Sequence, residues 1–218
     1  LNGRGAERAL AAGLDHLQYV VSASDTHSRH NAGTGTDDAM AEFSVAAERA
    51  RAAGAAVEMT LATAMGCPFE DRIDAERVVD LARRAVDAGA SSIALADTIG
   101  VAAPTEVARL LDRVVPVVDV AVGVHLHDTR GMAIANAVAA LQHGARRLDA
   151  SVGGLGGCPF APNASGNVPI EDLAHALAAM GVATGVSVEL LVVAAETACG
   201  AVGREVASHV GVAGPRFA

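Results

Sequence analysis

The chain has 218 residues, of which 16 are basic and 25 acidic, so its formal net charge is −9 at pH 7. Hydrophobic residues make up 51% and charged residues 19%, a composition that fills a core and leaves little polar excess for a disordered tail. A net negative charge without a basic stripe argues against nucleic acid or an anionic membrane as the main partner. We therefore expect a globular domain that binds neither.

Cysteine usage and the N-terminal residues indicate the cellular compartment. Cys67, Cys158 and Cys199 are an odd number of cysteines far apart in the chain, so we expect reduced thiols rather than a disulfide framework. The N-terminal segment lacks the pattern of a secretory signal, and no apolar run reaches the roughly 18 residues that cross a bilayer. The sequence therefore predicts a cytoplasmic protein.

Predicted strands and helices alternate along the chain. The strands are short and apolar, and glycine or polar turns bound them. They cover residues 16–22, 56–63, 91–95, 117–125 and 146–151. The predicted helices cover residues 4–12, 37–53, 74–88, 104–114, 132–142, 171–180 and 188–201. This β-then-α order predicts a parallel sheet covered by helices.

Polar residues gather at the carboxyl ends of several predicted strands, as at Ser22, Asp97 and His125. Chemistry at the ends of successive strands is typical of the TIM barrel, whereas an open doubly wound sheet normally carries a glycine-rich phosphate turn after its first strand. We therefore predict an α/β fold of the TIM (β/α)8 barrel class. Residues 1–218 would form one partial barrel domain, with residues 170–218 as a helical extension that covers the barrel.

The number of strands falls short of a closed barrel. A barrel has eight units and about 250 residues, but only about five C-terminal β/α units are predicted here. A fragment of a longer protein, strands supplied by another chain and an open relic would each explain the deficit. Because an unclosed barrel exposes two strand edges, we expect truncation.

The most specific local signal is His125-Leu126-His127-Asp128, at the end of the fourth predicted strand. Two histidines at i and i+2 on an extended strand point to the same side, so both imidazoles can face one metal ion at the barrel mouth. A single histidine at a strand end is more often a hydrogen-bonded rim residue. Two in phase, followed at once by Asp128, favour a metal site.

The second signal is a glycine-rich run that leads from Gly153 to Cys158 and continues to Asn167. Glycine costs backbone entropy, so the run indicates a mobile lid that carries a thiol. A flexible surface loop with an incidental cysteine fits the composition equally well. Asn167 could supply an amide oxygen to a hard cation such as Mg²⁺ or Mn²⁺, beside the imidazoles.

Together these motifs resemble 3-hydroxy-3-methylglutaryl-CoA lyase, within the wider group of metal-dependent TIM-barrel lyases and Claisen-type synthases. The resemblance rests on the histidine motif and on the glycine-rich run through Cys158 to Asn167. Shorter matches lie at residues 22–31, 66–70, 97–100 and 166–173. The similarity extends from about residue 3 to residue 195.

The resemblance implies a set of metal ligands and a catalytic thiol. His125, His127 and Asn167 would bind a divalent cation, Mg²⁺ or Mn²⁺, and Cys158 would be catalytic. The family also uses an aspartate ligand and an arginine in its first strand and a glutamate from its second unit. These three have no counterpart in this sequence, in agreement with the deficit of three units.

Further site residues are expected at the ends of other strands. Asp97 would contact substrate or orient the metal ligands, although an Asp-Thr turn that caps the following helix is an equal alternative. By the resemblance, Ser22 and Ser24 would contact the substrate. Asp25 stands where the family more often has glutamate, which leaves the contact at this rim open.

The activity that the resemblance implies is retro-Claisen cleavage of 3-hydroxy-3-methylglutaryl-CoA to acetyl-CoA and acetoacetate, as in leucine degradation. One alternative is a related Claisen-type acyl-CoA synthase, of the isopropylmalate or citramalate type. Such synthases usually carry Asn-Asp after the paired histidines and lack the thiol loop, so Asp128-Thr129 and Cys158 favour the lyase. The other alternative is a truncated, catalytically silent fragment.

The expected partners are an acyl-CoA substrate and a second copy of the chain. The segment 188–201 is almost wholly apolar and must be covered by something. A homodimer would cover it.

Overall fold

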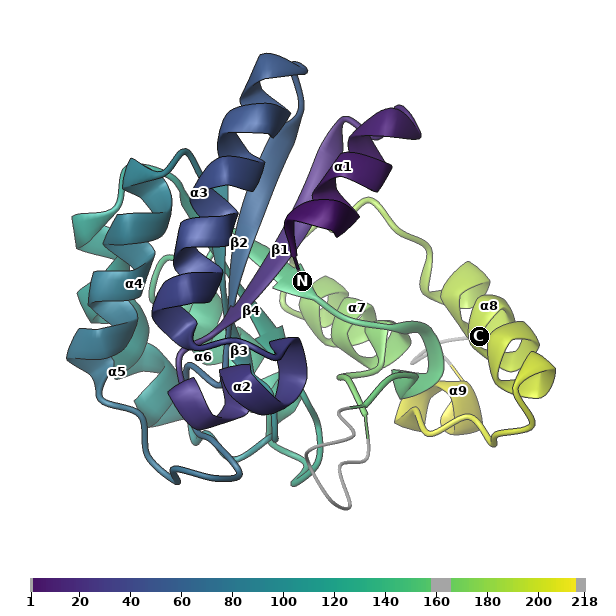
Figure 1. Ribbon diagram of the computed structural model, residues 1–218. Coiled ribbons are helices and arrows are strands. Elements are labelled where there is room, and N and C mark those ends of the chain that lie inside the picture. The colour runs from purple at the N-terminus through teal and green to yellow at the C-terminus, as the bar shows by residue number, and fades with distance from the viewer. Residues whose placement is uncertain (1, 158–165, 215–218) are drawn as a thin grey trace.

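The computed structural model describes residues 2–157 and 166–214, which form one sheet with helices packed around it. The sheet has five parallel strands in the order β1-β2-β3-β4-β5 (Figure 1). The strands are β1 (His16–Ser22), β2 (Ala56–Ala62), β3 (Ser92–Asp97), β4 (Ala121–Leu126) and β5 (Arg147–Asp149). All five predicted strands are present, and strand order that follows chain order is the barrel topology, so the partial barrel is confirmed.

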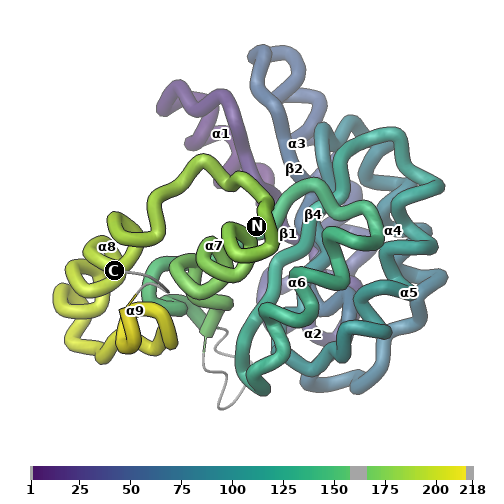
Figure 2. Tube along the Cα trace, turned by 180° about the vertical axis from the view of Figure 1, so that it is seen from behind, coloured from purple at the N-terminus to yellow at the C-terminus, as the bar shows by residue number. Residues whose placement is uncertain are grey.

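Helices connect the strands and follow the last one. They are α1 (Gly3–Ala11), α2 (Asp25–Ala32), α3 (Thr36–Ala52), α4 (Ala75–Asp87), α5 (Pro104–Val114), α6 (Ala133–Gln142), α7 (Ile170–Ala179), α8 (Val188–Ala201) and α9 (His209–Ala213). The seven predicted helices are confirmed, with ends shifted by one residue at most. Both views show α8 and α9 beyond α7, on the side away from α4 and α5 (Figures 1 and 2).

The structure differs from the prediction at three places. Helices α2 and α9 were not predicted, because α2 is polar on all sides and α9 is only five residues long. The fourth strand was predicted from residue 117, but Val115–Val117 form a 3₁₀ turn and β4 begins at Ala121. Pro116, within this turn, lacks the N–H that a strand pairing requires.

The two faces of the sheet differ in chemistry. One face packs against α3, α4 and α6 and carries large apolar side chains. It includes Leu17, Tyr19, Val21, Met59, Leu61, Ile93, Leu95, Val122 and Val124. Since side chains alternate along a strand, the other face carries the residues between these. These are small or polar residues and include Gln18, Glu58, Thr60, Ser92, Gly123, His125, Arg147 and Asp149.

This second face, which we call the inner face, is the interior side of the partial barrel. Among the strands described, β1 and β5 each pair with one neighbour only, so both form sheet edges. No helix in residues 2–157 and 166–214 is long and apolar enough to span a bilayer.

Candidate functional site

The two motif histidines lie side by side at the carboxyl end of β4. His125 belongs to β4 and His127 follows it, and the centroids of their rings are 5.3 Å apart. Both line a cavity of about 220 Å³, together with inner-face residues of β1, β2 and β3 such as Gln18 and Thr60. The alternation of the strand therefore brings the imidazoles together as predicted.

Asn167 joins the histidines through an extended segment that lies between the ends of β4 and β5. Asn167 forms an antiparallel bridge with His127. The N–H of Val168 donates to the carbonyl of Leu126 at 3.0 Å, and the N–H of Ser151 donates to the carbonyl of Val168 at 3.2 Å. A residue 40 positions beyond His127 is thus held directly beside it.

The side chain of Asn167 has a fixed orientation. Its Nδ2 donates to the carbonyl of Leu155 at 2.8 Å, which leaves Oδ1 as the atom available to another group. Within the described residues, Oδ1 is buried and has no hydrogen-bond partner. Gly156 and Gly166 make this arrangement possible, because both have φ values (+115° and +125°) that side-chain-bearing residues rarely adopt.

His127 shows the same unmet hydrogen-bonding capacity. Its side chain is buried, with 6% of its surface exposed, and no described residue accepts from or donates to Nδ1. Burial, with a smaller contribution from the nearby His125, lowers the pKa of His127 to about 4. The imidazole is therefore neutral at physiological pH and keeps a lone pair for a ligand.

These donors fit a divalent cation. The two imidazoles lie side by side, and Asn167 is bridged to His127. His127 and Asn167 each carry a buried polar atom that has no partner among the described residues, and an atom left unpaired in this way costs about 1–3 kcal/mol. The described part of the chain holds no cluster of three His, Cys, Asp or Glu side chains that could bind a metal. Any metal here would therefore depend on the amide of Asn167 and on further ligands.

A third histidine, which belongs to neither motif, also lines the cavity. His27, on α2, is buried, and its Nδ1 lies 2.7 Å from Oγ of Ser22. Its N–H donates to Oγ of Ser24 at 2.9 Å, so Ser24 is the N-cap of α2. Burial and the charge of His30 lower the pKa of His27. Ser22 and Ser24 do not line the cavity themselves, and Ser22 is connected to it through His27. Their predicted contact with the substrate stays a prediction.

Two buried carboxylates shape the loops around the site. Asp97 accepts from the N–H groups of Val101 and Ala102, each at 3.0 Å, and so closes the loop after β3. Burial raises the pKa of Asp97, although the bonds from these N–H groups act to lower it. Glu171, which the sequence analysis assigned no role, accepts from the N–H of Gly153 through both oxygens, at 3.0 and 3.2 Å. It thereby holds the start of the glycine-rich run.

The cysteines occupy different surroundings. Cys158 lies outside the described residues, so its predicted catalytic role stays a prediction. Gly157, the residue before it, lines the same cavity as the histidines. Cys67 and Cys199 are free and buried, as expected for thiols that serve packing.

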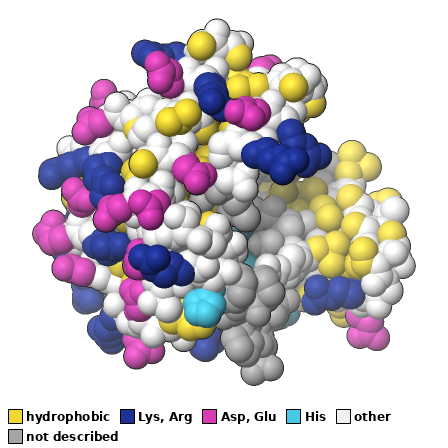
Figure 3. Space-filling view, viewed as in Figure 1, with side chains coloured by type: hydrophobic (Ala, Val, Ile, Leu, Met, Phe, Trp, Pro, Cys, Tyr) yellow, Lys and Arg dark blue, Asp and Glu magenta, His cyan; other side chains and the backbone are white. Residues whose placement is uncertain are grey.

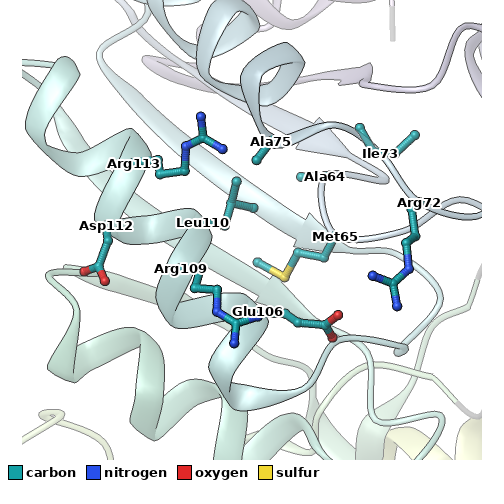
Figure 4. A pocket seen from close by; sticks show the side chains of 10 residues that line it. All are labelled: Ala64, Met65, Arg72, Ile73, Ala75, Glu106, Arg109, Leu110, Asp112 and Arg113. Atoms are coloured by element: carbon teal, nitrogen blue, oxygen red, sulfur yellow. The ribbon is translucent and has the colours of Figure 1, made fainter.

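A second cavity lies away from this site. It measures about 440 Å³ and is lined by α4, α5 and the loop after β2, with Arg72, Arg109 and Arg113 on its walls (Figure 4). Arg113 pairs with Glu76, and the carboxylate of Glu106 accepts from the N–H of Ala103. Despite its size, we place the functional site at the strand ends, where buried polar atoms lack partners.

Charged and apolar side chains occupy different parts of the molecular surface. Charges of both signs cover the side formed by α3 and α4, whereas apolar side chains gather over α8 (Figure 3). On α8, Leu190 and Val193 expose 72% and 57% of their surface. The apolar segment 188–201 is thus only partly covered within the described chain.

Comparison with known proteins relates the chain to one family of enzymes. Residues 1–197 match the family model described as HMGL-like. The chain is 45% identical to (R)-citramalyl-CoA lyase of Chloroflexus aurantiacus, covering 99% of this chain and 68% of that protein. It is 38% identical to the mitochondrial hydroxymethylglutaryl-CoA lyase of Rattus norvegicus, covering 96% of this chain and 65% of that protein. The chain therefore spans about two thirds of these relatives' length.

A solved structure agrees with this relation. An HMG-CoA lyase from Acinetobacter baumannii, in complex with coenzyme A and 3-methylmalate, superposes with a TM-score of 0.93 at 36% identity. The match covers 99% of this chain and 71% of that one. The five-stranded sheet described above is thus part of the barrel of such enzymes.

Proposed function

The chain belongs to the HMGL-like family, and from that premise we propose that it carries the metal-binding side of a site that cleaves a carbon–carbon bond in a 3-hydroxyacyl-CoA. The observation that carries this proposal is that His125 and His127 line one cavity and Asn167 is bridged to His127, while His127 Nδ1 and Asn167 Oδ1 are buried and have no hydrogen-bond partner among the described residues.

The three ligands would hold Mg²⁺ or Mn²⁺, since amide oxygen and imidazole suit these cations. A bound divalent cation would polarise the substrate's hydroxyl and fix the orientation of its oxygens. The chain's own contribution is preorganisation: His127 is neutral at working pH, and the bond from Nδ2 of Asn167 to the carbonyl of Leu155 fixes the amide and leaves Oδ1 as its available atom. The reaction also needs a base that takes the proton of the substrate's hydroxyl. A histidine that binds the metal is a poor candidate for this base, so we assign His125 and His127 to ligation.

Cys158 would protonate the carbon of the leaving acetyl group. When the carbon–carbon bond breaks, its electron pair passes to the thioester as an enolate, and the thiol proton goes to the enolate carbon. Support comes from Gly157, which already lines the cavity and is bonded to Cys158. A loop that closes over the site would also exclude water from the enolate.

The substrate has two candidates, which share a hydroxyl and a methyl group on the carbon β to the thioester. The sequence motifs favour 3-hydroxy-3-methylglutaryl-CoA, which would yield acetyl-CoA and acetoacetate. The 45% identity with (R)-citramalyl-CoA lyase favours (R)-citramalyl-CoA, which would yield acetyl-CoA and pyruvate. His27, held by Ser22, stands at the wall of the cavity where substrate oxygens would be recognised.

The test is a coupled assay of the full-length protein with each acyl-CoA in the presence of Mg²⁺ or Mn²⁺. We expect release of acetyl-CoA that depends on the metal and is abolished by EDTA. If the metal-bound protein cleaved neither compound, the result would contradict the proposed lyase activity. Condensation of acetyl-CoA with a 2-oxo acid instead would indicate the synthase alternative.

A further inference from the structure

The inner face of the sheet carries a linked set of charged and polar side chains below the histidines. Glu58 on β2 is almost fully buried, with 1% of its surface exposed, and pairs with Arg147 on β5. Its two oxygens also accept from Gln18 on β1 and Ser92 on β3, each at 2.9 Å. Glu58 is therefore fully bonded, and Arg147 is held across the face of the sheet.

Asp149 extends this set to the site. In the pairing of β4 with β5, Asp149 lies directly opposite His125. Its Oδ2 is 3.5 Å from Nδ1 of His125 and 3.4 Å from Nε2 of Gln18, and its Oδ1 is 3.7 Å from Nε of Arg147. One carboxylate oxygen thus faces both the imidazole and Gln18, and the other faces Arg147.

This geometry leaves one ring nitrogen of His125 for a ligand. A carboxylate beside Nδ1 favours the tautomer that carries its proton there, because a carboxylate only accepts hydrogen bonds. The lone pair is then on Nε2, at the opposite side of the ring. Metal-binding histidines commonly have such a partner, which fixes the tautomer and the ring orientation.

We propose that Asp149 is a positioning residue, which accepts the Nδ1 proton of His125 and thereby presents Nε2 to the metal. The inference rests on the proposed function for one point only, namely that a divalent cation binds to Nε2. The contact itself is a property of the metal-free chain.

The groups that face the Asp149 carboxylate are His125, Arg147 and Gln18. Arg147 and Gln18 belong to the set that Glu58 holds on the inner face, so the carboxylate is held in place beside His125.

The chain offers a matched control on its surface. His143 and Asp112 form a similar pair, with Nδ1 and Oδ1 2.7 Å apart, at a solvent-exposed position. Neither residue lines the cavity that contains His125. Asp112→Ala removes a carboxylate from a histidine without touching the candidate ligands.

The first experiment reads the tautomer in the full-length, metal-free protein by long-range ¹⁵N–¹H NMR of labelled histidine. We expect His125 to carry its proton on Nδ1, and Asp149→Ala to shift it toward the Nε2–H form that free histidine prefers. A wild-type His125 protonated on Nε2, or a tautomer unchanged by Asp149→Ala, would overturn the proposal. The wild-type measurement needs no variant, so it decides even if Asp149→Ala does not fold.

The second experiment measures Mn²⁺ affinity by titration calorimetry. Asp149→Ala is expected to weaken binding about 10–100-fold, Asp149→Asn to weaken it less because the amide oxygen still accepts, and Asp112→Ala to leave it unchanged. Equal affinities of wild type and folded Asp149→Ala would overturn the proposal. A wild type that binds no Mn²⁺ would instead contradict the proposed function, while the tautomer still reports on the contact.

Discussion

At the scale of single residues, the site depends on where each side chain finds its partners. The i and i+2 spacing of His125 and His127 was sufficient to predict that their rings lie together, because strand alternation is local. Asn167 could be assigned only by resemblance, since its place beside His127 depends on a bridge between distant segments. His27 was missed because its partner Ser22 lies across a strand–helix boundary and no periodicity marks the pair.

Removal of one ligand tests the role of His127. His127→Ala is expected to lower Mn²⁺ affinity more than about 100-fold, since loss of a direct ligand exceeds the 10–100-fold effect of an outer partner. Titration calorimetry and metal analysis of the full-length protein measure this. His16→Ala is the control, because His16 is exposed at the start of β1. Metal content equal to wild type in His127→Ala would contradict ligation.

Cys158 has a separate test, since it is assigned to proton transfer rather than metal binding. Cys158→Ala is expected to lower kcat by about 10²–10⁴-fold, the usual contribution of a positioned acid, while metal content stays near wild type. Cys67→Ala removes a buried thiol elsewhere and should keep turnover within a few-fold. Normal turnover of Cys158→Ala would remove the catalytic assignment.

At the scale of elements, the apolar strands and the punctuated helices could be predicted because their signals are local. Gly54, Gly89 and Gly144 follow α3, α4 and α6 with positive φ, as their positions suggested. The sequence does not reveal the alternation of apolar and polar residues along the strands, because small residues such as Ala94 and Gly123 stand among the polar ones on the inner face. The polar set around Glu58 therefore emerges only when five strands are placed side by side.

The packing of β1 against α3 allows a stability test. Tyr19 packs edge-on against Phe43, with ring centroids 5.4 Å apart, and within the described residues its buried hydroxyl has no partner. Burial, and the charge of Glu42, raise the pKa of Tyr19 to about 12. Tyr19→Phe removes the unpartnered hydroxyl, so we expect equal or higher stability at pH 7, by up to about 1–2 kcal/mol.

The same variant has a predicted pH dependence. Because the folded pKa lies above that of the unfolded chain, near 10, the unfolded state releases its proton first, and Tyr19 costs stability progressively from about pH 10 to pH 12. Below pH 10 this effect is absent. Urea unfolding at pH 7 and pH 11 should show that Tyr19→Phe loses less stability than wild type at the higher pH. Parallel losses would contradict a buried, neutral tyrosine.

At the scale of the whole molecule, the sheet is an arc of a barrel with polar groups on its inner face and two strand edges. The barrel class could be predicted from the placement of chemistry at strand ends, and the structure places those ends around one cavity. The arrangement of α8 and α9 beyond α7 could not, because no local signal fixes how helices after the last strand pack.

The exposed apolar face of α8 leads to a prediction about association. A homodimer that buries Leu190 and Val193 would cover the patch. Leu190→Glu with Val193→Glu is then expected to shift the full-length protein toward a monomer in analytical ultracentrifugation, without loss of helical content. Association unchanged by both charges would exclude this face from the interface, and a monomeric wild type would exclude the dimer.

Anomalous diffraction from crystals of the full-length protein soaked in Mn²⁺ decides whether His125, His127 and Asn167 bind one divalent cation at the ends of β4 and β5. We expect a single peak within about 2.0–2.3 Å of one nitrogen of each imidazole and of Oδ1 of Asn167. A manganese bound elsewhere, or one that contacts none of these three atoms, would contradict it.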